Sequence, residues 1–303
     1  MRVLVTGATG FVGGRLVPAL VDAGHEVTVL VRDADRYDPP DGVRVVEGDL
    51  LDPASYAAAL DVEAAYYLVH SMTARDDFET RDRQAATGFA RAASDAGVER
   101  VIYLGGLGEE RNGLSTHLRS RREVERVLAT GTYALTTLRA AIIVGAGSAG
   151  FEMIRQLATR LPVMVTPRWV RTPCQPIAVD DVIAFLVGVL DAPETAGETF
   201  EVGGPEVLTY AEMLRRTGRH LGHEPIIVAV PVLTPRLSAY WVGLMTDVPW
   251  RVARPLIAGL KNPVVVHDDR LREVVPVDPT PFDGAVRRAL AGEEGSRADA
   301  APA

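Results

Sequence analysis

Residues 1–14 read MRVLVTGATGFVGG, and this stretch decides the fold class. The apolar run at residues 2–6 predicts a β-strand that ends directly at Gly7, and residues 11–23 predict a helix. Glycine permits a tight turn close to a phosphate, and the helix that follows points its N-terminus at the negative charge. A glycine-rich turn without a ligand is the alternative. We predict a dinucleotide-binding turn made of Gly7, Thr9, Gly10, Phe11, Val12 and Gly13.

The first half of the chain repeats this alternation of short β-branched runs and helical stretches. Alternation of this kind is typical of a parallel sheet with helices on both faces. We therefore predict an α/β fold, a doubly wound parallel-sheet Rossmann fold, with the NAD(P)-binding domain at residues 1–150. Strands are expected at residues 2–6, 27–31, 43–47, 63–69, 101–104 and 134–139.

The alternation changes after residue 150, where prolines divide the chain into short pieces. Residues 172–203 contain a helix and a strand that we expect to return to the main domain. Residues 204–291 are predicted to form a smaller, mostly helical substrate or lid region, because N-cap signals recur there. Residues 292–303 lack large apolar side chains, which predicts a disordered tail.

Composition excludes several classes of protein. The net charge of −8 argues against nucleic acid as a partner, because phosphate binding needs clustered basic surface. Cys174 is the only cysteine, and His220 and His223 lack an evident third ligand, so no metal site is expected. No apolar run approaches the roughly 18 residues of a transmembrane segment. The chain opens directly into a strand, with no room for a signal peptide, so we expect a cytoplasmic protein.

The end of the second predicted strand indicates which dinucleotide binds. NAD sites place a carboxylate there for the ribose 2′-hydroxyl, whereas an arginine accommodates the 2′-phosphate of NADP. This chain has Val31-Arg32-Asp33 at that place. Because Arg32 can make a charge-assisted contact with a phosphate, we predict a preference for NADP(H), and NAD(H) held by Asp33 is the alternative.

A second glycine-rich stretch, Gly145–Gly150, also fits the spacing G-x-G-x-x-G. Proline-broken sequence follows it, and no acidic residue is suitably placed for a ribose. We interpret it as a loop on the substrate side. The first glycine turn remains the predicted cofactor site.

Several longer motifs resemble one known family. TGATGFVGG at residues 6–14, AGVERVIYLG at 96–105 and VDDV at 179–182 look like the extended and atypical short-chain dehydrogenase/reductases. YYLVHSM at residues 66–72 and HLRSR at 117–121 carry a narrower resemblance to NAD(P)H-binding NmrA-like proteins and to the related accessory subunit of respiratory complex I. The likeness to nucleoside-diphosphate-sugar epimerases is more distant.

The resemblance implies cofactor contacts beyond the glycine turn. Asp49 and Leu50 would lie beside the adenine. The nicotinamide ribose would be bordered by Leu68, Val69 and His70.

The chain departs from the family at the catalytic pair. Ordinary members use Tyr-x-x-x-Lys, in which the lysine holds the ribose and lowers the tyrosine pKa for proton transfer. No tyrosine here has a lysine four residues later, and His117 and Arg121 stand at the matching positions. In one interpretation, His117 donates the proton and Arg121, one helical turn away, holds the ribose. In the other, the pocket binds cofactor and has lost redox chemistry.

Residues 226–266 are unusually apolar and include Trp241 and Trp250 among several arginines. This pattern is typical of a pocket for a hydrophobic substrate, of peripheral membrane contact, or of plain helix packing. We predict an NADP(H)-dependent oxidoreductase or isomerase that acts on an apolar small molecule. A non-catalytic redox sensor or assembly factor is the alternative, and the oligomeric state stays open.

Overall fold

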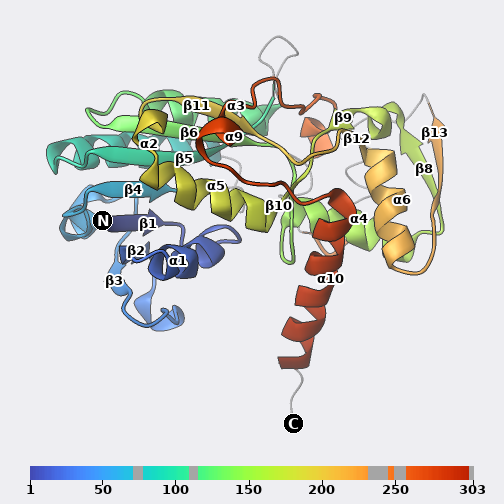
Figure 1. Cartoon of the computed structure of the whole chain (residues 1–303), viewed down its shortest axis with the longest axis horizontal. Helices are drawn as coiled ribbons and strands as arrows, with labels where there is room; N and C mark the ends of the chain where they lie inside the picture. The colour runs from blue at the N-terminus through green and yellow to red at the C-terminus, as the bar shows by residue number, and fades with distance from the viewer. Residues whose placement is uncertain (71–77, 109–114, 231–244, 249–256, 300–303) are drawn as a thin grey trace.

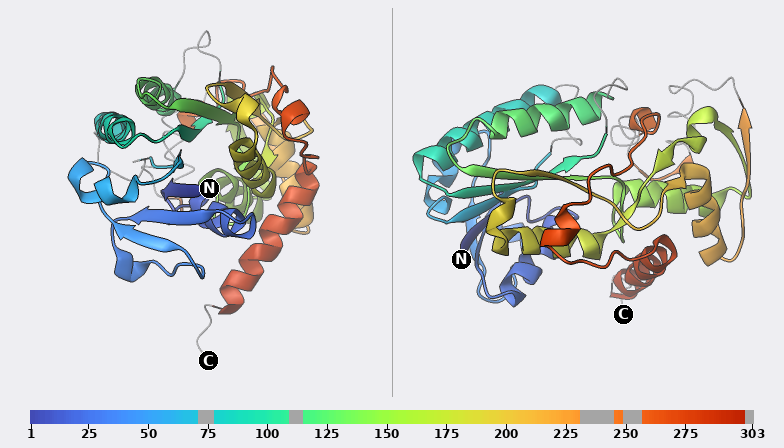
Figure 2. Two further views of the ribbon diagram at one scale, coloured as in Figure 1. Left: turned by 60° about the vertical axis from the view of Figure 1, so that its left-hand side comes forward. Right: turned by 45° about the horizontal axis from the view of Figure 1, so that its top comes forward.

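The computed structural model describes residues 1–70, 78–108, 115–230, 245–248 and 257–299. Its main feature is a seven-stranded sheet with helices on both faces (Figures 1 and 2). The strands are β1 (Arg2–Thr6), β2 (Glu26–Val31), β3 (Arg44–Glu47), β4 (Ala64–Tyr67), β5 (Arg100–Gly106), β6 (Ala134–Ala140) and β11 (Thr199–Val202). They pair in parallel in the order β11-β6-β5-β4-β1-β2-β3. The chain starts mid-sheet and winds outward on both sides, so the predicted doubly wound Rossmann fold is confirmed.

Each face of the sheet has its own hydrophobic layer. Helices α1 (Gly13–Asp22) and α5 (Val179–Asp191) cover one face, and α2 (Phe78–Asp95) and α3 (Thr116–Leu128) cover the other. Side chains alternate along β1, so Val3 packs in the α1–α5 layer and Leu4 packs in the α2–α3 layer. Burial on both faces explains why the centre of β1, Val3–Val5, is continuously apolar. Short 3-10 helices occur at Ala34–Arg36, Pro53–Ala59, Arg168–Arg171 and Pro193–Thr195.

A smaller region packs beside one end of the sheet, at the right of Figure 1. Its helices are α4 (Ala149–Arg160), α6 (Tyr210–His220) and α10 (Phe282–Asp299), and the short helix α9 (Leu271–Val274) lies against β11. Three ribbons complete it: β7 (Ile143–Val144) with β10 (Ile177–Ala178), β9 (Pro173–Cys174) with β12 (Leu208–Thr209), and β8 (Val163–Pro167) with β13 (Ile226–Val230). The described part of this region is mainly helical, as the sequence predicts.

Two segments differ from the sequence-based expectations. The apolar stretch that starts at residue 226 begins with a strand, β13, and its tryptophans Trp241 and Trp250 lie outside the described residues. Helix α10 extends through Asp299, into the residues for which the sequence predicts a disordered tail, and that disorder stays a prediction. The start of α10 packs in the core of the smaller region, and the alanines, arginines and glutamates that follow favour helix formation.

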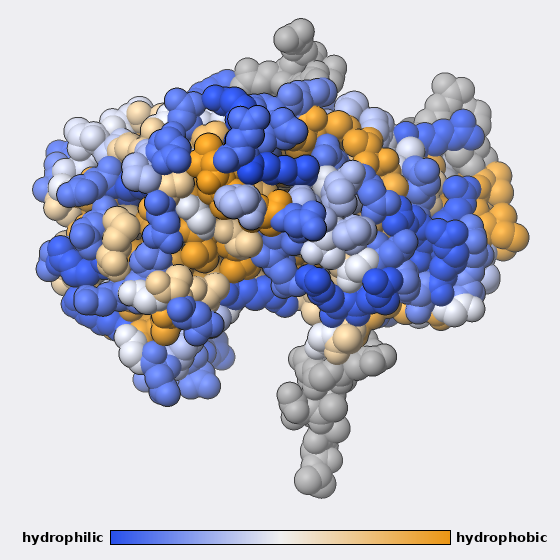
Figure 3. Space-filling model, viewed as in Figure 1, coloured by the Kyte–Doolittle hydropathy of each residue, from blue (hydrophilic) through white to orange (hydrophobic). Residues whose placement is uncertain are grey.

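The ribbon of β8 and β13 carries an exposed apolar face. Val163, Val165, Ile226 and Val228 occupy neighbouring positions of the two strands, and all four are between 47% and 62% exposed. Figure 3 shows the apolar colouring at that end of the molecule. In the described part of the chain, no helix combines the length and hydrophobicity that crossing a bilayer requires.

Candidate cofactor and substrate site

The turn between β1 and α1 leaves no room for side chains at its glycines. Gly7 has a φ of +74°, which L side chains rarely adopt, and a Cβ at Gly13 would lie 2.2 Å from the carbonyl oxygen of Gly7. Val12 precedes α1 and provides no side-chain cap; the amides of Gly14 and Arg15 donate to the backbone carbonyls of Gly10 and Val12. Close-approaching backbone and an uncapped helix N-terminus together fit the pyrophosphate of a dinucleotide.

A cavity of about 480 Å³ extends from this turn along the carboxyl ends of the central strands. The turn contributes Gly7, Gly10, Phe11, Val12 and Gly13 to its wall. Much of the remaining wall is apolar and includes Leu104, Leu107, Ile142, Met153 and Leu260. Ligands of open parallel sheets bind at this edge, so the cavity is the candidate ligand site.

Helix α3 places two of the predicted site residues on the cavity wall. The helix begins after Ser115, whose hydroxyl accepts a hydrogen bond from the amide of Leu118. His117 and Arg121 follow at a spacing of one turn, and His70 joins them from the end of β4. The wall of one cavity therefore includes these three polar side chains as well as the cofactor turn.

The two histidines are neutral at neutral pH. Desolvation is the main cause that lowers the pKa of His117, to about 3, and the nearby charge of Arg121 lowers it further. Desolvation, then Arg121, then His117 lower the pKa of His70 in the same way. Each imidazole can therefore donate or accept a hydrogen bond here without carrying charge.

Arg121 supplies the charge of the cavity. Among the described residues that line it, Arg121 alone is charged at neutral pH. Its guanidinium forms no ion pair within the described ranges; its side chain hydrogen-bonds the Tyr103 hydroxyl, which also donates to its backbone carbonyl. A half-buried guanidinium without a carboxylate partner, next to apolar walls, is suited to an electronegative ligand group.

Other predicted residues lie away from this cavity. Thr9 is exposed on the turn, and Leu50 is buried with Val69 packed nearby in the α2–α3 layer. The Asp49 carboxylate accepts a hydrogen bond of 2.9 Å from the amide of Leu51. Arg32, at the end of β2, is exposed as well. None of Thr9, Arg32, Asp49, Leu50 and Val69 is among the residues that line the cavity.

The charged residues that follow β2 differ in their ionic contacts. Asp33 lies 3.7 Å from the guanidinium of Arg36, so its carboxylate already has a cationic neighbour. The Arg32 guanidinium has no partner in the described part of the chain. Asp33 lies next to Arg36, so no described carboxylate competes with a phosphate for the guanidinium of Arg32.

The second glycine stretch lines the cavity next to the cofactor turn. Gly147 and Gly150 line the cavity, and a Cβ at Gly145 would lie 3.0 Å from the Phe11 ring. Arg15 joins the two loops: its guanidinium donates to the carbonyls of Phe11 and Ala146, each at 2.8 Å, and stacks on the Phe11 ring at 4.6 Å. Sequence reasoning missed Arg15, because no local pattern signals a contact that spans 131 positions.

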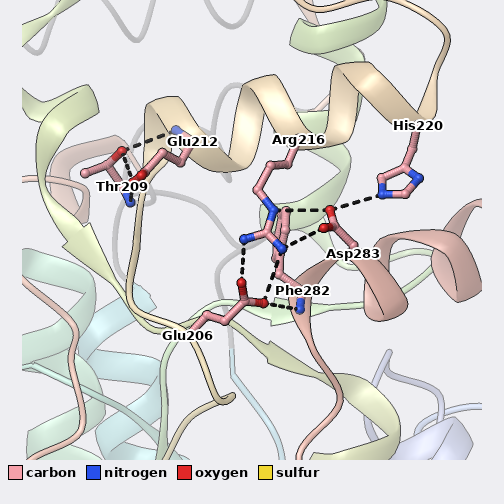
Figure 4. Close-up of polar contacts among 7 residues, drawn as sticks. All are labelled: Glu206, Thr209, Glu212, Arg216, His220, Phe282 and Asp283. Carbon is pink, nitrogen blue, oxygen red and sulfur yellow. Dashed lines mark hydrogen bonds and ion pairs between the residues drawn. The ribbon is translucent and has the colours of Figure 1, made fainter.

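The histidines at the end of α6 have structural contacts. His220 lies 3.1 Å from Asp283, which also pairs with Arg216, and Arg216 pairs with Glu206 (Figure 4). The His223 ring contacts the carbonyl of Ala158. The described residues contain no cluster of three or more histidine, cysteine, aspartate or glutamate side chains that could hold a metal ion.

Comparisons with known proteins agree with this geometry. A family model described as NAD(P)H-binding matches residues 7–154. The 3-diazoavenalumate denitrifying reductase of a Streptomyces species is 30% identical over 276 residues, which cover 80% of this chain and 88% of that protein. Mitochondrial NADH dehydrogenase (ubiquinone) 1 alpha subcomplex subunit 9 of Arabidopsis thaliana is 26% identical, over 88% of this chain and 70% of that protein.

Among solved structures, a nucleoside-diphosphate-sugar epimerase from Staphylococcus aureus shares the fold, with a TM-score of 0.76. The two sequences are 16% identical, and the match covers 95% of this chain and 100% of the epimerase. The sequence relatives, the matching family model and the glycine turn agree on one assignment. The chain belongs to the NAD(P)H-binding reductases of the atypical short-chain dehydrogenase/reductase family.

Proposed function

We propose that this protein is an NADP(H)-dependent reductase that acts on an apolar small molecule in the cavity. One observation carries the proposal: a single cavity is lined by the glycine turn, by His117 and Arg121 and by apolar side chains. When bound, the reduced nicotinamide supplies a hydride. The chain's own residues then have to hold the cofactor, orient the acceptor and respond to the charge that develops on it.

The cofactor contacts follow from the positions of the site residues. Backbone at Gly7–Gly13 would receive the pyrophosphate, and Arg32 the 2′-phosphate of NADP. The family resemblance supports Asp49 and Leu50 beside the adenine, and Leu68 with its two successors beside the nicotinamide ribose. Because Asp33 already lies near Arg36, an arginine contact with phosphate is favoured over a carboxylate contact with the ribose.

The pKa of His117 decides its role in this proposal. With the pKa lowered to about 3, the imidazolium is absent at neutral pH. His117 would then orient the acceptor as a neutral N–H donor, and the proton would come from solvent. Arg121 is permanently charged, so it can hold a ribose hydroxyl or an acceptor oxygen but cannot shuttle a proton.

The test is oxidation of NADPH by purified protein with a panel of quinones and enones. His117→Gln keeps a neutral N–H donor but changes its position, and we expect kcat to fall by about tenfold to a hundredfold. His267→Gln alters an exposed histidine outside the cavity and should leave turnover unchanged. Equal turnover of wild type and His117→Gln would remove His117 from the mechanism.

A second candidate function is a non-catalytic, cofactor-binding redox sensor or assembly factor. The similarity to a subunit of mitochondrial NADH dehydrogenase and the missing Tyr-x-x-x-Lys pair favour it. In that case NADPH would bind tightly, and no acceptor in the panel would oxidise it.

A further inference from the structure

We propose that the acceptor in this cavity is a conjugated carbonyl compound, and that Arg121 binds the carbonyl oxygen on which negative charge develops. The proposal rests on the proposed reductase function and names its substrate class. It gives Arg121 a direct contact with the substrate. A guanidinium has five donors, so a ribose hydroxyl can share it with this oxygen.

No described carboxylate compensates the charge of Arg121. Its side chain hydrogen-bonds the neutral Tyr103 hydroxyl but forms no ion pair within the described ranges, and no carboxylate stands among the described lining residues. An uncompensated charge at a partly buried wall is unfavourable until an anionic or strongly polar group meets it. Since the surrounding wall is apolar, attraction between Arg121 and a developing oxyanion is stronger than in water.

The other polar groups of the wall are poor proton donors. His70 and His117 have lowered pKa values, chiefly because they are desolvated. The Ser148 hydroxyl donates to the carbonyl of Ile143 at 2.6 Å. Burial raises the pKa of Tyr210 well above its usual value, and its hydroxyl bonds to the Cys174 thiol. Among the described lining residues, none of these groups releases a proton readily near neutral pH.

A positive charge without a good proton donor beside it favours a substrate whose reduction produces a delocalised anion. Reduction of a simple ketone produces an alkoxide, which needs a proton donor beside the oxygen. In a conjugated carbonyl compound, hydride forms a C–H bond at the β carbon. The π electron pair of the C=C bond then forms a double bond between the α carbon and the carbonyl carbon, and the π pair of the C=O bond moves to the oxygen. The resulting enolate is delocalised, and Arg121 can stabilise it until a solvent proton forms the α C–H bond. The C=C bond is thereby reduced and the carbonyl group is retained.

The activity test compares enones with their saturated ketones, for example benzylideneacetone with benzylacetone. Wild type should oxidise NADPH with the enones and form the saturated ketones, and the saturated ketones should not be reduced. Arg121→Met should lower kcat/KM for the enones by about 10²–10³-fold, the loss seen when an oxyanion donor is removed. Arg121→Lys should recover part of it, because lysine restores the charge without the planar fork.

The matched control is Arg119→Met. Arg119 lies on the same helix, is exposed and does not line the cavity. The substitution removes the same charge and should leave the reaction unchanged. An equal loss in both variants would overturn the assignment of Arg121, because it would mean that the net charge of α3 matters and the contact does not.

A binding measurement tests Arg121 without turnover. Bound 4-nitrophenol is a planar, delocalised oxyanion once it ionises, and its phenolate absorbs visible light. With NADP⁺ present, wild type should raise the acid dissociation constant of bound 4-nitrophenol at least tenfold, and Arg121→Met should abolish this effect. Identical titrations of the two proteins would overturn the role of Arg121.

The two measurements separate the possible failures. Saturated ketones reduced as fast as enones would overturn the substrate class and leave the reductase function standing. No oxidation of NADPH with any acceptor would contradict the reductase function itself and the substrate class with it. In that case the phenol titration still decides whether Arg121 binds an oxyanion.

Discussion

At the scale of single residues, Gly13 is the most constrained position of the cofactor turn. Gly13→Ala would place a Cβ 2.2 Å from the Gly7 carbonyl oxygen, so the backbone that receives the pyrophosphate must move. We expect NADPH affinity to fall by at least about tenfold, which corresponds to roughly 1.4 kcal/mol of binding free energy. Fluorescence titration of NADPH measures the change.

Gly14→Ala is the matched control for Gly13→Ala. A Cβ at Gly14 would lie 3.5 Å from the Ala8 carbonyl oxygen, an ordinary contact distance. Binding should therefore be retained, and the helix should gain up to about 1 kcal/mol from the replacement of glycine. If both variants bound NADPH as wild type does, the turn would not be the pyrophosphate site.

We expect Arg32 to determine the preference for NADP(H) over NAD(H). Arg32→Ala should weaken NADPH binding by about tenfold or more, because a charge-assisted contact with the 2′-phosphate contributes roughly 1.5–3 kcal/mol, and NADH binding should not change. Arg44→Ala removes the same charge from an exposed site at the opposite end of a neighbouring strand. Tighter binding of NADH by wild type, unaffected by Arg32→Ala, would reverse the preference to NAD(H).

At the scale of elements, Arg216 connects α6 to the start of α10. Its guanidinium pairs with Glu206 and Asp283 and lies 5.3 Å from the centre of the Phe282 ring (Figure 4). Arg216→Met keeps the apolar stem and removes the guanidinium from two carboxylates, of which Asp283 keeps His220 and Glu206 keeps the amide of Phe282. We expect a loss of about 1–3 kcal/mol in the free energy of unfolding, below the value for a fully buried pair because both carboxylates are partly exposed. Urea unfolding at pH 7 measures it.

The same pairs predict how stability depends on pH. Hydrogen bonds from Arg216 are the main cause that lowers the pKa of both Glu206 and Asp283. A carboxyl whose pKa is lowered in the folded state stabilises the fold above its unfolded pKa, which is 4.5 for Glu206 and 3.8 for Asp283. That stabilisation disappears as the pH falls through the lowered values.

Between pH 6 and pH 3, the stability of Arg216→Met should therefore decline less steeply than that of wild type. Arg288→Met provides the comparison, because the pair of Arg288 and Asp180 is more than half exposed on both sides. It should cost at most about 1 kcal/mol and leave the shape of the pH profile unchanged. If the free energy of unfolding fell equally with pH in wild type and Arg216→Met, the contact between α6 and α10 would not depend on the ionisation of these carboxylates.

Local patterns were sufficient to predict most elements of the fold. Alternating apolar runs predict the six strands from β1 to β6, and the capping box at Thr209 and Glu212 predicts the start of α6. The strand at residues 226–230 is harder to predict, because an apolar run of this length fits a strand or a buried helix equally well. Pairing with β8, more than sixty positions earlier, decides it.

At the scale of the whole molecule, the candidate site depends on contacts between distant segments. The sequence predicts the glycine turn, and the family resemblance adds His117 and Arg121, which the structure brings to one cavity. Neither Arg15, which holds the Gly145–Gly150 loop against Phe11, nor the apolar wall contributed by Leu260 has a local signal. Such contacts follow from tertiary packing, so periodicity and motif spacing cannot reveal them.

The central claim is that the nicotinamide lies in the same cavity as His117 and Arg121. A crystal structure of the complex with NADP⁺ tests it most directly. The account predicts the pyrophosphate against Gly7–Gly13, the 2′-phosphate in contact with Arg32, and the nicotinamide ring inside the cavity within reach of Arg121. A nicotinamide ring outside this cavity, or a dinucleotide bound away from the glycine turn, would contradict it.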